Sequence, residues 1–305
     1  MSLPFYKKRG TRLFIYTLPL LLIVFLMSYL PVYGWIYSFY NYKPGMKLAD
    51  CTFIGLKNFI MMARDPFSRS NVLRVLTNTA GISLLGILFS PLSMMLAILL
   101  NEVRAGSYKK VVQSLTTIPY FIGWVLVYAL AFSMLSTNDG FINRLLVNTG
   151  VLSTPVNFLA SNSHVWLTMV LYGVWKGLGW GAIMYLAAIA GISGELYEAA
   201  RVDGAGRFKC ILYITVPGLM PTFFVLLLLS FANFFNLGME QYYVFQNAMN
   251  KNSIEVVDLY VYNQGIASVN YSFSTAVGML KSIISIILLF GANYISKLAR
   301  GQSIV

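Results

Sequence analysis

Long apolar runs separated by shorter polar segments set the pattern of this chain. Six runs have about 20 residues or more, which at 1.5 Å per residue is enough to cross a hydrocarbon core about 30 Å thick. The pattern predicts an all-α membrane protein with six transmembrane helices in a single domain, residues 1–305. The expected spans are residues 13–37, 73–100, 111–135, 165–192, 217–237 and 273–298.

Composition agrees with a membrane protein. Of 305 residues, 58% are hydrophobic and 10% are charged, whereas soluble domains carry about 25% charged residues. The net charge of +12 does not indicate nucleic acid, because Lys and Arg beside membrane spans follow from the orientation rule and from attraction to anionic lipid.

The distribution of Lys and Arg gives an orientation. Lys7 and Lys8 precede the first run, which is too long for a signal peptide and has no small-residue cleavage site after it. With both termini placed in the cytoplasm, the inner loops carry more basic residues than the outer loops. The short loop 101–110 is the clearest case, since it holds Arg104, Lys109 and Lys110.

The outer loop between the first two spans contains an amphipathic segment, residues 55–62. Two interpretations are about equal. It is either a short helix in the outer headgroup region, or a packed loop on the extracellular face.

A polar island, residues 193–216, separates the fourth and fifth spans. Ser193 is a suitable N-cap for a helix that begins at Gly194. The helix dipole favours the negative charges of Glu195 and Glu198 in its first turns. Gly204 is expected to take a left-handed conformation that ends this helix. A second short helix, roughly residues 207–213, is expected to lead to Pro217 at the start of the fifth span.

Within the island, Glu198-Ala199-Ala200 is followed after three residues by Gly204 and after nine more by Ile214-Thr215-Val216-Pro217. This pattern resembles the EAA loop of permease subunits in binding-protein-dependent ABC importers, with Val216 where Leu is usual. Residues 175–180 and 187–192 also resemble the span before that loop in maltose-type permeases. Residues 55–59 resemble an element after their first span. Residues 101–104 resemble the end of the second span in the branch of that family that carries polysaccharides and oligosaccharides. The other interpretation, a plain amphipathic loop with a chance EAA, explains fewer of these matches.

The resemblance implies the type I importer permease fold in the bacterial cytoplasmic membrane. It implies as partners a second homologous permease, two ATPase subunits, an extracellular or periplasmic solute-binding protein and membrane lipid, with no nucleic acid. The chain would be no enzyme and would bind no cofactor, since ATP and magnesium belong to the ATPases. The residues expected to couple to an ATPase are Glu198, Ala199, Ala200, Arg201, Asp203, Gly204 and Pro217. The expected cargo is an oligosaccharide or a polysaccharide fragment.

Polar groups at membrane depth are candidates for a substrate pathway. Lys176 in the fourth span either serves substrate, lines a water-filled cavity or pairs with a carbonyl of a broken helix. Asn233 and Asn236 are three residues apart and would share a helix face, near Phe235 and Tyr242. This face either lines the pathway, where aromatic rings and amides suit neutral sugars, or joins neighbouring helices by hydrogen bonds.

Other classes of function have less support. No carboxylate lies within an expected span, which argues against a proton-driven secondary carrier. No phosphate-binding Gly-rich loop, catalytic triad or metal-ligand spacing is present, which argues against an integral membrane enzyme. Cys51 and Cys210 are expected on opposite sides of the membrane and would not form a disulfide.

Overall fold

The computed structural model describes residues 9–160, 162 and 164–300. Lys7 and Lys8, which entered the orientation argument, lie outside the described residues. The chain divides into two compact units, Met1–Arg69 with Val261–Leu280, and Ser70–Tyr260 with Lys281–Val305. The single domain expected from the sequence stays a prediction.

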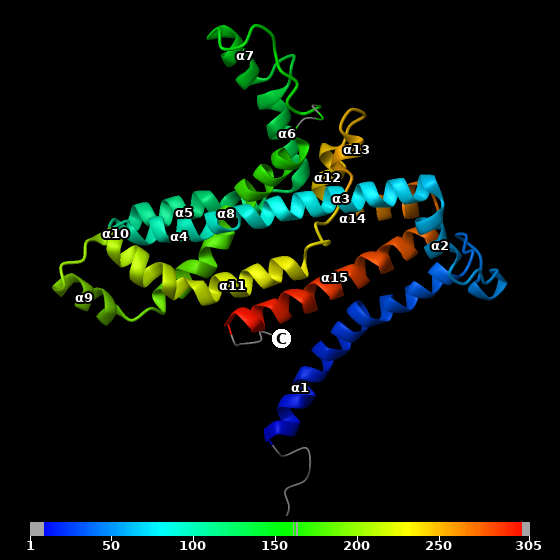
Figure 1. The fold of residues 1–305 in the computed structure, drawn as a ribbon, viewed down its shortest axis with the longest axis horizontal. Coiled ribbons are helices and arrows are strands. Elements are labelled where there is room, and N and C mark those ends of the chain that lie inside the picture. The colour runs from blue at the N-terminus through cyan, green and yellow to red at the C-terminus, as the bar shows by residue number, and fades with distance from the viewer. Residues whose placement is uncertain (1–8, 161, 163, 301–305) are drawn as a thin grey trace, which may run out of the picture. The chain divides into compact units, whose positions relative to one another are not determined.

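The described residues are predominantly helical (Figure 1), and the one β-bridge among them joins Tyr40 to Phe53. The longer helices are α1 (Arg9–Val24), α3 (Pro66–Phe89), α4 (Pro91–Glu102), α5 (Gly106–Phe121), α6 (Trp124–Leu135), α8 (Val165–Ala190), α11 (Val216–Ala232) and α15 (Tyr271–Arg300). The shorter α-helices are α2 (Lys57–Arg64), α7 (Phe141–Asn148), α9 (Gly194–Val202), α10 (Arg207–Cys210), α12 (Glu240–Phe245), α13 (Lys251–Ile254) and α14 (Val257–Tyr262). Tighter 3-10 turns form η3 (Leu30–Phe39) and η4 (Leu48–Asp50), and wider π turns form η2 (Phe25–Tyr29), η5 (Ile211–Thr215) and η6 (Asn263–Ala267).

The all-helical membrane architecture is confirmed in its coarse form. Four helical stretches, Gly10–Phe39, Pro66–Glu102, Arg207–Ala232 and Tyr271–Tyr294, are long and apolar enough to cross a membrane. Within the described residues, two bent pairs bring the number to at most six if each pair is one span: α5 with α6, and α8 with α9. The exact six-span count and the orientation of the termini stay predictions.

The expected third span, residues 111–135, is not one straight helix. It breaks at Ile122 and Gly123, which are both extended, and α5 and α6 meet at 105°. Pro119 lies in the last turn of α5 and removes one N–H donor there, which weakens the helix where the break follows. The apolar pattern alone continues through this point and does not reveal the break.

The helix that contains the expected fifth span begins before Pro217. The helix is continuous from Arg207 to Ala232, so the expected short second helix is its first part. The π turn η5 ends at Thr215, two residues before Pro217, and accommodates the missing N–H and the bulk of the ring without ending the helix. The π turn η2 stands in the same way just before Pro31.

In the first unit, the amphipathic segment forms helix α2, as one interpretation expected. Its polar Asn58 faces inward, and Nδ2 donates to the Ser38 carbonyl oxygen at 2.9 Å. Asp65 caps the start of α3, because its carboxylate accepts from the Ser68 backbone N–H at 2.8 Å. This hydrogen bond lowers the pKa of Asp65. The location of α2 in a headgroup layer stays a prediction.

In the second unit, α8 packs against α4, α5 and α11 (Figure 1). The core between them includes Ala97, Ala182 and Leu219, each 0% exposed. Gly179 allows the closest approach, since a Cβ there would lie 2.3 Å from the Thr116 carbonyl carbon of α5. Small residues at such contacts let helix backbones come together in a membrane.

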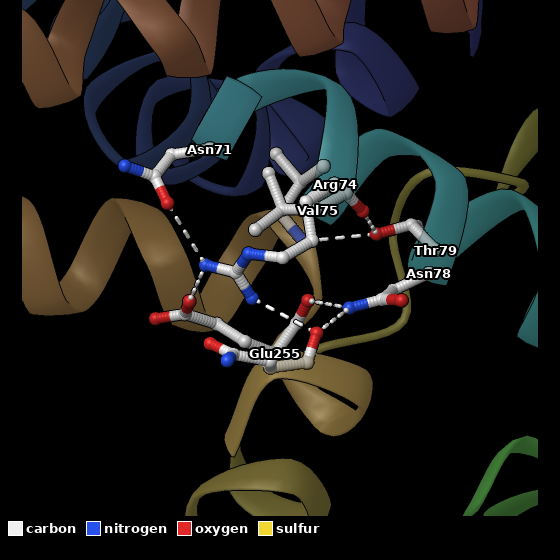
Figure 2. A network of polar contacts seen from close by, with 8 residues as sticks. Asn71, Arg74, Val75, Asn78, Thr79 and Glu255 are labelled. Atoms are coloured by element: carbon white, nitrogen blue, oxygen red, sulfur yellow. Dashed lines mark hydrogen bonds and ion pairs between the residues drawn. The ribbon is translucent and has the colours of Figure 1, made fainter. Parts of the chain in front are cut away.

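A polar network fixes the segment 252–257 to α3 (Figure 2). Arg74 forms an ion pair with Glu255 at 2.7 Å, and the Glu255 side chain is only 4% exposed. Asn78 Nδ2 donates to the carbonyl oxygens of Asn252 and Glu255 at 2.8 and 3.0 Å. Thr79 Oγ1 accepts from the Val257 backbone N–H at 2.9 Å. Backbone groups at the end of α13 and the start of α14 thus find their partners on side chains of α3.

We expect Arg74→Ala to destabilise the protein by about 3 kcal/mol, because it removes the guanidinium from a buried carboxylate. The measurement is the midpoint of thermal unfolding in detergent, followed with a thiol-reactive dye, since Cys51 and Cys210 are both free and buried.

The matched control is Arg144→Ala. Arg144 pairs with Asp139, but the two side chains are 63% and 87% exposed, and such a pair contributes at most about 1 kcal/mol. Equal decreases in the two midpoints would contradict the structural role of the buried pair.

Candidate functional site

Helix α9 forms the first half of the polar island and leaves α8 at an angle of 70°. The Ser193 side chain accepts a hydrogen bond from the Glu195 backbone N–H at 3.3 Å, so the expected N-cap is confirmed. Glu198 and Ala199 are exposed in the middle of α9, and Ala200 is half-buried. Most of this short helix therefore faces outward from the helices that support it.

Gly204 ends α9 in a left-handed conformation with φ +77°, as expected. The Ala205 N–H donates to the Ala200 carbonyl at 2.8 Å, and the Gly204 N–H donates to the Arg201 carbonyl at 3.1 Å. These two bonds form a Schellman motif, which satisfies the last carbonyls of the helix. The fixed spacing between Ala200 and Gly204 thus has a direct structural cause.

A side-chain hydrogen bond joins α9 to the long helix that follows it. Tyr197 Oη lies 2.9 Å from Thr215 Oγ1, and Thr215 is 1% exposed within η5. The sequence did not indicate this pair, because neither residue type nor a separation of 18 residues is diagnostic. The bond connects the expected coupling residues to the π turn before Pro217, which is itself exposed.

Helices α9 and α10 together form an elbow, the α9–α10 elbow, and its outer surface is apolar in part. Val202 is 88% exposed, Phe208 76% and Leu196 53%. Behind it lies a cavity of about 630 Å³, whose charged lining residues are Glu102, Arg104, Glu198, Arg201 and Arg207. The structure thus brings Glu198 and Arg201 together at one cavity, with the exposed Asp203 at the C-cap of α9.

A second cavity, of about 440 Å³, lies between α3, α4, α8 and the end of α11. Asn233, Asn236 and Tyr242 line it, as the pathway hypothesis requires. Phe235 is buried and does not line this cavity, and neither does Lys176.

The expected shared helix face of the two asparagines is wrong. Helix α11 ends at Ala232, and Asn233 and Asn236 lie in the turn that follows, where the Asn236 N–H donates to the Asn233 carbonyl at 2.8 Å. The turn, rather than a helix face, brings both side chains to the cavity. The apolar run extends beyond the helix because Phe234 and Phe235 are buried within the turn.

Several bonds fix this turn and the helix after it. Ser83 Oγ donates to the Phe234 carbonyl at 2.5 Å, and the Gly238 N–H donates to Asp258 at 2.9 Å. Asp258 also forms an ion pair with Lys281. Burial raises the pKa of Tyr242, and the Asp258 carboxylate raises it further, so the phenol remains a hydrogen-bond donor.

Sequence reasoning missed the serines of the cavity: Ser83, Ser90, Ser93 and Ser230. Their signal was weak, because isolated serines within apolar spans are common and usually bond to their own helix. Among the described residues that line the cavity, none is Asp, Glu, Lys, Arg or His. The cavity offers hydroxyls, amides and apolar surface, which suits an uncharged polar ligand.

Comparisons with known proteins agree with these features. The family described as "Binding-protein-dependent transport system inner membrane component" matches residues 89–301. Protein LplB of Bacillus subtilis (strain 168) is 38% identical over 291 residues, covering 95% of this chain and 90% of that protein. The polygalacturonan/rhamnogalacturonan transport system permease protein YteP of the same organism is 37% identical, covering 93% and 87%. A chain in the crystal structure of a bacterial alginate ABC transporter, in complex with alginate pentasaccharide-bound periplasmic protein, has a TM-score of 0.86 and 29% identity, covering 98% and 99%.

We expect Gly204→Ala to loosen the end of α9, because a side chain in the left-handed conformation costs about 1–2 kcal/mol. Amide hydrogen exchange at residues 204 and 205 should accelerate about tenfold. Gly206→Ala is the matched control, since Gly206 has φ −72° and open space around it. Equal exchange in the two variants would show that the left-handed cap does not hold this turn.

Proposed function

Because this chain belongs to the family of binding-protein-dependent transport system inner membrane components, we propose that it is a permease subunit of an ABC importer for an oligosaccharide or a polysaccharide fragment. The observation that carries the proposal is the elbow of α9 and α10. It presents Glu198, Arg201 and an exposed apolar surface on a rigid, capped turn. Such a surface suits docking into a groove of another protein.

The partner at the elbow is an ATPase subunit. The charged residues Glu198, Arg201 and Asp203 are exposed beside Val202, so the surface combines an apolar centre with a polar rim, as protein interfaces do. ATP and magnesium are bound by that partner and not by this chain. A second homologous permease carries the second elbow, for a second ATPase, in the cytoplasmic membrane of a bacterium.

A solute-binding protein delivers the cargo from the other side of the membrane. The crystal structure of the alginate transporter includes an alginate-bound periplasmic protein, which supports this part of the proposal. The transport cycle is alternating access. Closure of the ATPases displaces α9. Helix α8 begins near the cavity and ends beside α9, so it carries this displacement to the spans.

The cavity between α3, α8 and the turn after α11 supports an uncharged cargo unit. Asn233, Asn236 and Gln241 offer amides for sugar hydroxyls, and Phe234 and Tyr242 offer rings. A relative, AraP, is named for arabinooligosaccharides. Since the lining provides no cation for a carboxylate, we propose that this cavity receives a neutral sugar residue.

We expect Glu198→Lys to reduce ATP-dependent uptake more than about tenfold, because charge reversal at a docking surface costs several kcal/mol of binding. The variant should still reach the membrane, and it should no longer co-purify with the ATPase. Glu240→Lys is the control, since it makes the same charge change on the exposed surface of α12. Normal uptake in the Glu198 variant would count heavily against the coupling role.

We expect the double variant Asn233→Ala, Asn236→Ala to raise the oligosaccharide concentration for half-maximal uptake about 30-fold, because two hydrogen bonds of about 1 kcal/mol each are lost. Substrate-stimulated ATP hydrolysis provides the second measurement. Asn148→Ala, at the exposed end of α7, is the control. An unchanged Michaelis constant and maximal rate would remove these residues from the pathway.

A further inference from the structure

The 105° break between α5 and α6 is held by a side chain of α8. Helix α5 ends at Phe121, and the next two residues are extended. The Tyr120 carbonyl lies in the last turn of α5, where helix carbonyls have no donor four residues ahead. Lys176 Nζ donates to this carbonyl oxygen. A cation at the C-terminal end of a helix is also favoured by the helix dipole.

Aromatic rings complete the surroundings of the ammonium group. Lys176 Nζ lies 5.2 Å from the centre of the Tyr120 ring and 5.5 Å from that of Trp124. Both are distances at which a cation is attracted by a ring face. Trp124 is the first residue of α6, so the lysine contacts both sides of the break. No carboxylate pairs with Lys176 in the part of the chain that the structure describes.

Trp180 strengthens the same contact. It lies four residues after Lys176 and therefore on the same face of α8. Its ring stacks on Tyr120 with a centroid distance of 4.7 Å and an interplanar angle of 5°. Lys176 thus binds the Tyr120 carbonyl, and the Trp180 ring stacks on the Tyr120 side chain. Gly179 lies between them and lets the α5 backbone come into contact with α8 at Thr116.

The structure assigns Lys176 as a positioning residue. Its ammonium group, together with the Trp180 ring, fixes the α5–α6 elbow on α8. The assignment rests on the proposed importer function in one respect: the contacts of Lys176 and Trp180 let α8, α5 and the start of α6 move as one body when α9 is displaced. The ammonium group is already bound to a carbonyl and two rings, so it is committed to the elbow and not to the cargo.

The test is the distance between α5 and α6 in the full transporter complex in lipid nanodiscs, without nucleotide or sugar. Cys51 and Cys210 are replaced by Ser, and spin labels are attached at Leu115 and Leu130, which are 62% and 50% exposed. We expect a narrow distance distribution in the otherwise unchanged chain. Lys176→Met should lose the narrow peak, and Lys176→Arg, which keeps the donor and the cation, should restore it.

Further variants separate this assignment from a general loss of structure. Tyr120→Phe keeps the carbonyl and the ring and should retain the narrow peak, whereas Trp180→Leu should broaden it. If Lys176→Met does not accumulate in membranes, Lys176→Gln and Trp180→Leu decide, and both should be broader than the parent chain. A narrow peak in Lys176→Met, or in both of these variants, would overturn the assignment. The measurement is repeated on this chain alone in nanodiscs, without nucleotide, sugar or other subunits, so the result stands even if the importer proposal fails.

Discussion

The close packing of α8 against its neighbours is the constraint on which the rest of the second unit depends. A Cβ at Gly179 would lie 2.3 Å from the α5 backbone, and one at Gly181 would lie 2.6 Å from Ser93 Oγ of α4. Because apolar side chains gain little by leaving lipid, helices in a membrane are joined by such close contacts and by polar bonds. Helix α8 leads into the exposed α9 at one end and forms a wall of the cavity through Gly173 and Gly177.

Side-chain bonds to backbone atoms provide the second kind of cohesion. Backbone groups at helix ends have no partner within their own helix, and a polar backbone group without a partner is costly at membrane depth. Asn78, Ser83 and Gln241 each donate to a carbonyl far away in the sequence. Through these bonds the turn after α11 and the segment 252–257 have defined positions, and the cavity has a defined lining.

The sequence predicts the features that depend on local chemistry. The Ser193 cap, the left-handed Gly204 and the helical character of the apolar runs each follow from a few neighbouring residues, and the structure agrees with them. The break between α5 and α6 at Ile122 could not be predicted in this way, because the apolar run continues through it without a local signal. Hydrophobicity shows that residues are buried or in lipid, but not that their backbone is helical.

Tertiary partners were likewise beyond the sequence. Lys281 pairs with Asp258, and Tyr197 bonds to Thr215, across separations that no pattern encodes. The continuous helix through Pro217 depends on a π turn, whereas a proline more often marks a helix start. For the pathway, the sequence named Asn233, Asn236 and Tyr242, which line the cavity, and Phe235, which does not.

Crosslinking at α9 is the most direct test of whether the α9–α10 elbow docks on an ATPase subunit. A photoreactive amino acid is placed at Val202, which is 88% exposed at the end of α9, and a second is placed as a control at Met249, which is 67% exposed between α12 and α13. We expect the residue at position 202 to capture an ATPase subunit in membranes and the one at position 249 not to. Failure of position 202 to capture an ATPase, in membranes that contain the assembled transporter, would contradict the docking of α9 on an ATPase.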